Sequence, residues 1–140
     1  MLRDWSDVYS VGIAEIDHQH QGFFEASHRL YQRILEREEL QAVAEALTFM
    51  RDYAASHFST EESFMRDHAY PALAAHQALH AAFFKRLDAL ADDLATFGPS
   101  QDLADRALDL TQDWLVDHIT DEDVLYALHA RTHATDVAVS

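Results

Sequence analysis

The chain contains no cysteine, only three glycines and only two prolines in 140 residues. The lack of cysteine excludes disulfides, thiolate metal ligands and cysteine nucleophiles. So few glycines and prolines exclude a sandwich or barrel with many tight turns. Basic residues are also scarce, because 10 Lys and Arg against 25 Asp and Glu give a formal net charge of −15. Such a charge repels nucleic acid and anionic membrane surfaces, so we expect neither as a partner.

Long hydrophobic runs and a signal-peptide core are missing as well. No apolar stretch approaches the roughly 18 residues that a membrane span needs, and the first residues mix charged and apolar side chains. We therefore expect a soluble, cytoplasmic protein whose length suits a single domain with a real core. The abundant residue is histidine, whose ten copies equal Lys and Arg together. That number of imidazoles requires an explanation.

Apolar residues recur at three- and four-residue spacing along most of the chain, which predicts a nearly all-helical protein. An arm over residues 1–16 precedes the first helix, for which Asp17 is a plausible N-cap. Later boundaries are expected before Pro71, which suits a first helical position, and at 98–100, where Gly, Pro and Ser give a stop, a breaker and an N-cap. Short connections between the helices predict an all-α, antiparallel up-down four-helix bundle that forms one domain over 1–140. The predicted helices span about 17–37, 41–66, 72–96 and 101–128, with a tail that frays after Leu128.

Each predicted helix carries at least one histidine on an otherwise apolar stripe. On two of the helices, polar side chains follow one another at i,i+4 spacing, so both members of a pair can reach one point beside the helix. The polar residues on these stripes are His20 on the first helix, His57 and Glu61 on the second, His76 and His80 on the third, and His118 on the fourth, where Asp121, Glu122 and Asp123 follow it.

A single histidine on an apolar face is usually a core residue that bonds a backbone carbonyl. Five imidazoles from four helices do not fit that explanation, because unpaired imidazoles and carboxylates are costly in a core, and a metal offsets this cost better than mutual bonding does. The donors exceed those of a tetrahedral zinc, and calcium or magnesium sites use oxygen ligands. Mixed nitrogen and oxygen donors in this number indicate two first-row ions, most naturally iron, that share carboxylates. The low number of anionic donors favours reversible binding over oxygenase chemistry.

Five motifs stand in order along the chain: Ile16-Asp17-x-Gln19-His20, His57-Phe58-x-x-Glu61-Glu62-x-x-Met65, Tyr70-Pro71, His76-x-x-x-His80, and Trp114-Leu115-Val116-Asp117-His118-Ile119-x-x-x-Asp123-x-x-Tyr126. Together they resemble the bacterial hemerythrins, and the resemblance covers about residues 5–126. It implies a non-haem di-iron site that binds dioxygen. The cofactor would be two iron ions, as Fe²⁺ or Fe³⁺, with a bridging oxo or hydroxo group.

The resemblance also implies a role for each matching residue. Dioxygen would bind at an open position on the iron that has only two histidines, inside an apolar pocket that denies protons to the bound oxygen. The implied ligands are His76, His80 and His118 for one iron and His20 and His57 for the other, with Glu61 and Asp123 bridging both. The implied pocket residues are Phe23, Phe24, Phe58, Trp114, Leu115 and Ile119.

One of these ligands does not follow from helical spacing. His118 and Asp123 are five residues apart, about 500° of turn on a regular helix, so they do not share a face. Spacing alone favours Glu122 or Asp121 as the partner of His118. Only the resemblance selects Asp123, and it implies that the helix bends or widens after His118.

The remaining histidines are expected to have smaller roles. We interpret His28, where the family more often has asparagine, as a hydrogen-bonding residue at the core edge, with proton supply as the alternative. His18 is expected in solvent, and His68 is expected to complement the dipole at a helix end. His129 and His133 lie in the tail that is predicted to fray.

Three classes of function remain open at this point. The leading one is reversible dioxygen binding for storage, delivery or sensing, by a protein that is not primarily an enzyme. The second is a di-iron redox enzyme of the oxidase, peroxidase or nitric-oxide reductase type, which would use the same open iron position. The third is a metal-buffering or purely structural bundle. The sequence identifies neither an oxygen-using enzyme nor a sensory protein as a partner.

Overall fold

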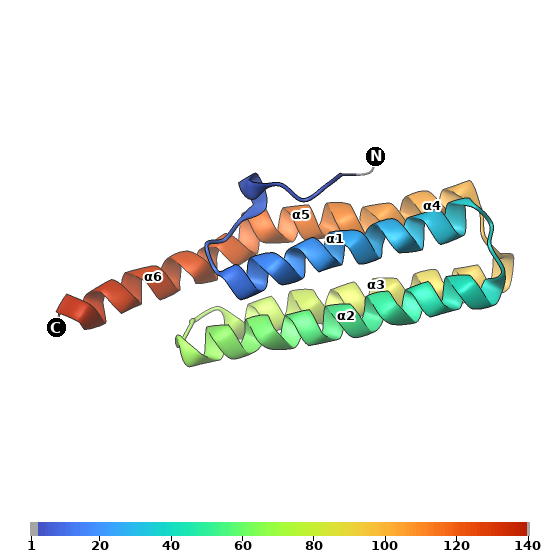
Figure 1. The fold of residues 1–140 in the computed structure, drawn as a ribbon. Coiled ribbons are helices and arrows are strands. Elements are labelled where there is room, and N and C mark those ends of the chain that lie inside the picture. Colours follow the sequence, from blue (N-terminus) through green and yellow to red (C-terminus); the bar gives the residue numbers. More distant parts are fainter. Residues whose placement is uncertain (1–2, 140) are drawn as a thin grey trace.

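The computed structural model describes the backbone of residues 3–139 and the side chains of residues 3–132. Within these residues it contains helices and no strands. Figure 1 shows four antiparallel helical rods side by side, so the predicted up-down four-helix bundle is confirmed. The first three rods are α1 (Ala14–Leu35), α2 (Leu40–Asp67) and α3 (Leu73–Phe97), and the fourth joins α4 (Gln101–Leu108), α5 (Trp114–His118) and α6 (Val124–Val139).

The fourth rod differs from the other three because two of its turns are π-helical. These turns are η2 (Asp109–Asp113), between α4 and α5, and η3 (Ile119–Asp123), between α5 and α6. A π-helical turn inserts an extra residue into the hydrogen-bonding pattern and therefore rotates the side chains that follow it. α1 packs against both α2 and α4, while α3 contacts α2 and α4, which closes the bundle around one core.

Local signals explain several helix boundaries. The Ser100 hydroxyl accepts a hydrogen bond from the backbone N–H of Leu103 at 3.1 Å, so the predicted N-cap of α4 is confirmed. α3 ends at Phe97 and is followed by Gly98, whose φ of 78° favours glycine. Pro71 lies in the turn before α3 and not in its first helical turn as predicted, since α3 begins at Leu73. His68 ends α2 as expected, and its Nδ1 donates to the Phe64 carbonyl at 2.8 Å.

Asp17 is not the N-cap of the first helix, because α1 already begins at Ala14. Its carboxylate instead accepts hydrogen bonds from the Val11 backbone N–H at 2.8 Å and from the Ser10 hydroxyl at 2.5 Å. A short 3₁₀ helix, η1 (Asp7–Tyr9), precedes these contacts in the arm. Asp17 therefore ties the arm to α1.

The prediction that the chain frays after Leu128 is also wrong. α6 continues to Val139 and projects beyond the other rods in Figure 1, since the sequence after Leu128 contains no glycine or proline to end it. His129 is held in this helix, with its Nε2 at 2.9 Å from the His68 carbonyl oxygen. The side chain of His133 lies outside the described residues.

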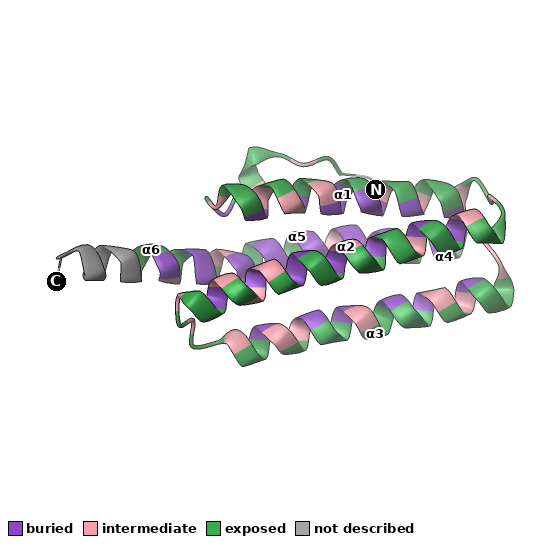
Figure 2. Ribbon diagram, turned by 60° about the horizontal axis from the view of Figure 1, so that its bottom comes forward, coloured by how far each residue is buried: buried purple, intermediate pink, exposed green. Residues whose placement is uncertain are grey.

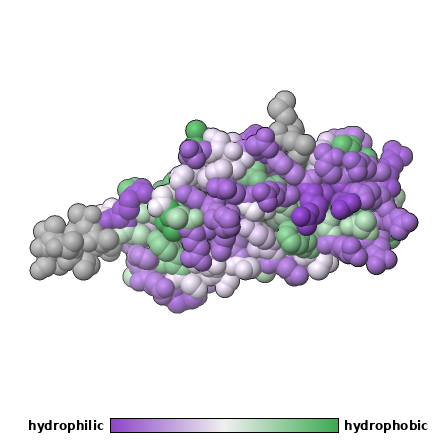
Figure 3. All heavy atoms as spheres, viewed as in Figure 1, coloured by the Kyte–Doolittle hydropathy of each residue, from purple (hydrophilic) through white to green (hydrophobic). Residues whose placement is uncertain are grey.

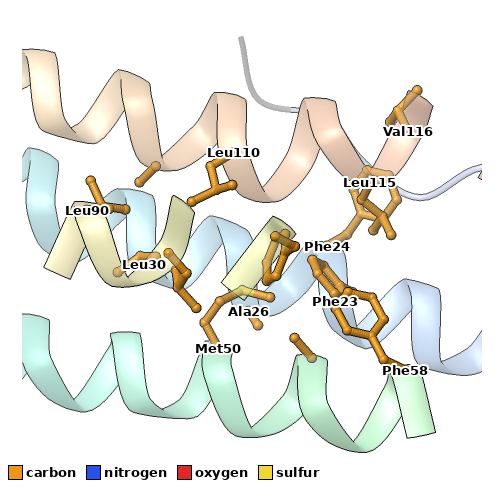
Figure 4. Close-up of a cluster of buried hydrophobic side chains, with 14 of the residues drawn as sticks. Phe23, Phe24, Ala26, Leu30, Met50, Phe58, Leu90, Leu110, Leu115 and Val116 are labelled. Carbon is orange, nitrogen blue, oxygen red and sulfur yellow. The ribbon is translucent and has the colours of Figure 1, made fainter. Parts of the chain in front are cut away.

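The interior changes character along the bundle axis. Buried positions recur at helical spacing along every rod in Figure 2 and alternate with exposed ones. Near the α1–α2 connection the buried residues are apolar, whereas near the α2–α3 connection they include histidines and carboxylates. Figure 4 shows the apolar cluster where these two ends meet, with Phe23 of α1 directed toward Phe58 of α2. The apolar end includes Leu30, Ile34, Val43, Leu90, Leu94 and Leu103.

The surface is mostly hydrophilic in the view of Figure 3, and hydrophobic residues appear on it as separate small areas. No helix in the described part of the chain is both long enough and apolar enough to cross a membrane.

Candidate metal centre

Seven polar side chains meet in the bundle interior, and none of them is more than 5% exposed. They come from all four rods, so no local stretch of sequence forms the cluster. Its members are His20, His57, Glu61, His76, His80, His118 and Asp123, which are the seven predicted ligand positions.

The π-helical turn η3 explains why Asp123 belongs to this cluster. In a π-helical turn the backbone hydrogen bond joins residues i and i+5, which brings Asp123 beneath His118. The Oδ1 atom of Asp123 lies 3.1 Å from Nε2 of His118. Asp121 is exposed and Glu122 is only half-buried. The widening after His118 that the resemblance implied is therefore confirmed.

The two carboxylates lie between two groups of imidazoles. Glu61 directs Oε1 toward Nε2 of His57, at 2.5 Å, and its Oε2 is 3.8 Å from Nε2 of His76. Asp123 directs Oδ2 toward Nε2 of His20, and its Oδ1 toward Nε2 of His76, at 3.2 Å in each case. Each carboxylate thus has one oxygen on the side of each imidazole group.

The larger group consists of three imidazoles from α3 and α5. Nε2 of His118 lies 2.9 Å from Nε2 of His76 and 3.3 Å from Nε2 of His80. Burial lowers the pKa of His80 to about 3, so this imidazole is neutral at pH 7 and has a free lone pair. Three imidazoles that direct their Nε2 atoms toward one another are typical of ligands arranged around a cation.

The charges of the acidic members suit a cation as well. Burial alone would raise the pKa of Asp123, but the surrounding imidazoles, above all His118 and then His20 and His76, hold it well below its usual range. Burial, together with the Asp123 and Glu61 carboxylates, raises the pKa of Tyr126 well above its usual value. Tyr126 therefore keeps its proton and donates it to Oε2 of Glu61 at 2.8 Å.

Several polar atoms in the cluster have no hydrogen-bond partner among the described residues, although they are fully buried. Leaving such atoms unpaired in a core is costly, and metal coordination removes that cost. Two sets of donor atoms lie within 4.8 Å of one another, so the residues present fit two cations. The sets are Glu61, His76, His80 and His118, and His20, His57 and Glu61. The unpartnered atoms are His20 Nδ1 and Nε2, His57 Nε2, Glu61 Oε1, His76 Nδ1 and both carboxylate oxygens of Asp123.

Three residues that contact the cluster were assigned no role from the sequence. Gln19 Oε1 is 2.8 Å from Nδ1 of His57, and Glu62 Oε2 is 2.8 Å from Nδ1 of His80. Tyr126, which bonds Glu61, is the third. All three stand inside the motifs that carry the family resemblance, two of them directly next to a predicted ligand position. That placement was the signal that could have identified them.

Three of the predicted pocket residues form a continuous aromatic wall beside the cluster. Phe58 lies 6.2 Å from Phe23 and 5.7 Å from Trp114 between ring centroids. It also stacks on the His80 ring at 3.8 Å, and Trp114 stacks on the His118 ring at 4.5 Å. Two further predicted pocket residues, Leu115 and Ile119, are fully buried.

The positions of two other phenylalanines, Phe83 and Phe24, differ from the predicted composition of this wall. Phe83 was not predicted for the pocket, yet its ring lies 5.7 Å from Phe23 and 4.8 Å from Trp114. Its position one turn after a site histidine of α3 was the available signal. The ring contacts of Phe24 are with the arm, at 5.6 Å from Tyr9 and 6.2 Å from Trp5. Phe24 therefore packs beneath the arm.

Two histidines outside the cluster, His28 and His18, are placed as expected. Nε2 of His28 donates to the Arg3 carbonyl at 2.6 Å and lies 3.2 Å from Oε1 of Gln112, which confirms the hydrogen-bonding interpretation. His18 is exposed, as predicted. A part for His28 in proton supply stays a prediction.

Comparison with known proteins points to one family and one fold for this chain. The sequence profile of the family described as "Hemerythrin HHE cation binding domain" matches residues 11–128. The chain is 33% identical to the bacteriohemerythrin of Stenotrophomonas maltophilia over 136 residues, which are 96% of this chain and 85% of that protein. It is 27% identical to the myohemerythrin of Riftia pachyptila over 122 residues, covering 87% and 88% of the two chains. The crystal structure of a hemerythrin mutant superposes with a TM-score of 0.78 at 24% identity, over 92% of this chain and 97% of that one.

Proposed function

This chain belongs to the hemerythrin family, and on that premise we propose that it binds dioxygen reversibly at a non-haem di-iron centre. The protein would store, deliver or sense oxygen, in the cytoplasm. The observation that carries the proposal is the meeting of five imidazoles and two carboxylates from four rods, several of whose buried donor atoms have no hydrogen-bond partner among the residues that the structure describes. The family name indicates an oxygen-binding protein rather than an enzyme.

The arrangement of the carboxylates supports two ions and not one. Glu61 and Asp123 each direct one oxygen toward each imidazole group, as a ligand shared by two ions must. The proposed division of the remaining ligands is His76, His80 and His118 for one iron and His20 and His57 for the other.

When bound, the iron pair supplies two electrons and an open coordination position, which together are what reversible oxygen binding requires. The group with two imidazoles has fewer protein donors than the group with three, so we place the open position there. The protein's own part is to hold the ligands and to control what else reaches that position.

Water exclusion is the first task of the surrounding side chains. The wall around the centre is apolar. It consists of the packed rings of Phe23, Phe58 and Trp114 and of the buried side chains of Leu115 and Ile119. Because an apolar wall supplies no protons, oxygen that binds there is released again more easily than it is reduced further. Tyr126 holds its proton on the hydroxyl that faces Glu61, which keeps that carboxylate oriented.

The test is an absorption spectrum of the aerobic protein together with its iron content. We expect two irons per chain and a visible band that appears with oxygen, disappears on deoxygenation and returns on re-aeration. A ferric spectrum that never cycles would instead indicate a redox enzyme. Iron uptake without any response to oxygen would indicate metal buffering, and either result would overturn the proposal.

A further inference from the structure

We propose that Gln19 and Glu62 are positioning residues that make the two halves of the centre chemically unequal. A neutral amide holds His57 of the half with two histidines, and an anionic carboxylate holds His80 of the half with three. The inference rests on the proposed function, because it assigns the two partners to the two iron sites. It adds which half is built to favour the higher positive charge.

On the first half, a chain of hydrogen bonds orients the Gln19 amide. The Thr60 hydroxyl donates to the Ser56 carbonyl at 3.2 Å, so the proton of this hydroxyl is already used. Thr60 can then only accept from Gln19, whose Nε2 lies 3.3 Å from the hydroxyl oxygen. The amide oxygen must consequently face His57, where it accepts the Nδ1 proton at 2.8 Å. The His57 proton stays on Nδ1, and the lone pair on Nε2 points into the centre.

The backbone of Gln19 is fixed by a close contact between α1 and α2. The Tyr53 hydroxyl donates to the Gln19 carbonyl at 2.9 Å. This approach depends on Gly22, because a Cβ atom built there would lie 2.0 Å from the Tyr53 hydroxyl oxygen. Gly22 therefore lets the ring of Tyr53 reach α1 and hold Gln19 opposite His57.

On the second half, a charged carboxylate takes the place that the neutral amide has on the first half. Nδ1 of His80 donates to Oε2 of Glu62 at 2.8 Å, and Oε1 of Glu62 accepts from the Gln77 amide at 3.0 Å. Both carboxylate oxygens are thus occupied, and the Glu62 side chain is only 23% exposed. A carboxylate that accepts the Nδ1 proton makes the imidazole a more basic ligand than an amide does.

His57 and His80 therefore both direct Nε2 toward the centre, but the imidazole of His80 is the more electron-rich ligand because its Nδ1 proton is bound by an anion. An anion near an ion lowers the energy of its more positive state, and a neutral amide lacks this effect. The carboxylate behind His80 therefore stabilises the more positive oxidation state of the iron on that half. The iron on the half with His57, where oxygen would bind, lacks this stabilisation and is more easily reduced again. Nδ1 of His20 and of His76 has no hydrogen-bond partner among the described residues, so this contrast is not repeated there.

Two reciprocal substitutions that preserve shape test the inference. Gln19→Glu places an anion behind His57, and we expect a lower midpoint potential and autoxidation faster by about tenfold, the lower end of the roughly 10–100-fold by which outer-shell substitutions change the affinity or activity of metal sites. Glu62→Gln removes the anion behind His80 and is expected to raise the potential. The matched controls are Gln21→Glu on α1 and Glu45→Gln on α2, which make the same charge changes at exposed positions. Shifts in the same direction, or no larger than those of the controls, would overturn the inference.

A second readout does not depend on oxygen binding. In the zinc-loaded, diamagnetic protein we expect ¹H–¹⁵N NMR signals from the Nδ1 protons of both His57 and His80. Thr60→Val removes the group that orients the Gln19 amide and should weaken the His57 signal alone, while Thr60→Ser should restore it. Absence of either signal in the wild type would overturn the inference. These measurements separate the two proposals. A wild-type protein whose spectrum does not respond to oxygen would overturn the proposed function. The midpoint potentials and the NMR signals would still decide whether Gln19 and Glu62 act as inferred.

Discussion

At the end of the bundle near the α1–α2 connection, the interior is filled by side chains such as Leu30, Ile34 and Leu94. At the end near the α2–α3 connection, the same rods place imidazoles and carboxylates at the interior positions. The apolar end is complete without a ligand, because burial of hydrocarbon is favourable by itself. The polar end contains buried atoms that find no hydrogen-bond partner within the described part of the chain, and we expect a ligand to complete it. Stability is therefore concentrated at one end and function at the other.

The backbone follows the same division. α1, α2 and α3 are regular along their length, whereas the fourth rod is interrupted by π-helical turns at Asp109–Asp113 and Ile119–Asp123. Such turns are less favourable than regular helix and recur at functional sites. The second of them directs Asp123, one of the proposed ligands, into the polar cluster. The departure from regular helix therefore coincides with the entry of Asp123 into the cluster.

Metal removal should have the largest effect on this comparison. Chelation leaves the polar end with unpaired imidazoles and carboxylates, so we expect the melting temperature to fall by more than about 10 °C, since each kcal/mol corresponds to about 4 °C in a domain of this size. Differential scanning calorimetry of the metal-loaded and metal-free protein measures this difference. A metal-free protein that melts within a few degrees of the loaded one would show that the polar end is complete without a metal.

The next effect concerns the carboxylate that the π-helical turn supplies. Asp123→Ala removes a buried group that faces His20, His76 and His118, and we expect iron content to fall sharply. Asp121→Ala and Glu122→Ala are the matched controls on the same turn and should retain full iron. Full iron loading in Asp123→Ala, together with loss in Glu122→Ala, would move the ligand to the position that regular helical spacing favours.

A cavity at the apolar end should lower stability without altering the site. Leu30→Ala is expected to reduce the free energy of unfolding by about 2–5 kcal/mol, the usual cost of a large-to-small core change, because Leu30 is fully buried. Iron per chain and oxygen binding should equal those of the wild type. Denaturant titration and iron analysis on one preparation measure both quantities. A loss of iron in this variant would show that the two ends are coupled.

The smallest effect is expected from a change in the pocket wall. Ile119→Glu adds an acidic group beside His118 without removing a ligand, so iron content should stay at the wild-type level. The added carboxyl group can exchange protons with bound oxygen, and we expect the oxygenated band to decay several-fold faster. Ile119→Val is the control that keeps the wall apolar. An unchanged lifetime at equal iron content would remove Ile119 from the proposed pocket.

Much of this division could be predicted from the sequence. The apolar stripes of α1, α2 and α3 follow from periodicity. Gly98 determines where α3 stops, and Ser100 determines where α4 starts. Predictions failed where a distant partner decides the outcome. Asp17 was assigned to cap a helix, but its carboxylate is bound to the arm, and the tail after Leu128 stays helical with His129 bonded to the α2–α3 turn.

The sequence by itself determined the helical period, the Gly98 stop, the Ser100 cap and the kinds of donor that enter the core, because these depend on residues within one or two turns of one another. Only the tertiary structure decided that Asp123, and not Glu122 or Asp121, faces the cluster, since the π-helical turn is stabilised by contacts with imidazoles from other rods. The same holds for the bond between Gln19 and His57, which joins residues 38 positions apart. Groups so distant in the chain meet only when the rods pack, so no local pattern records which of them will pair.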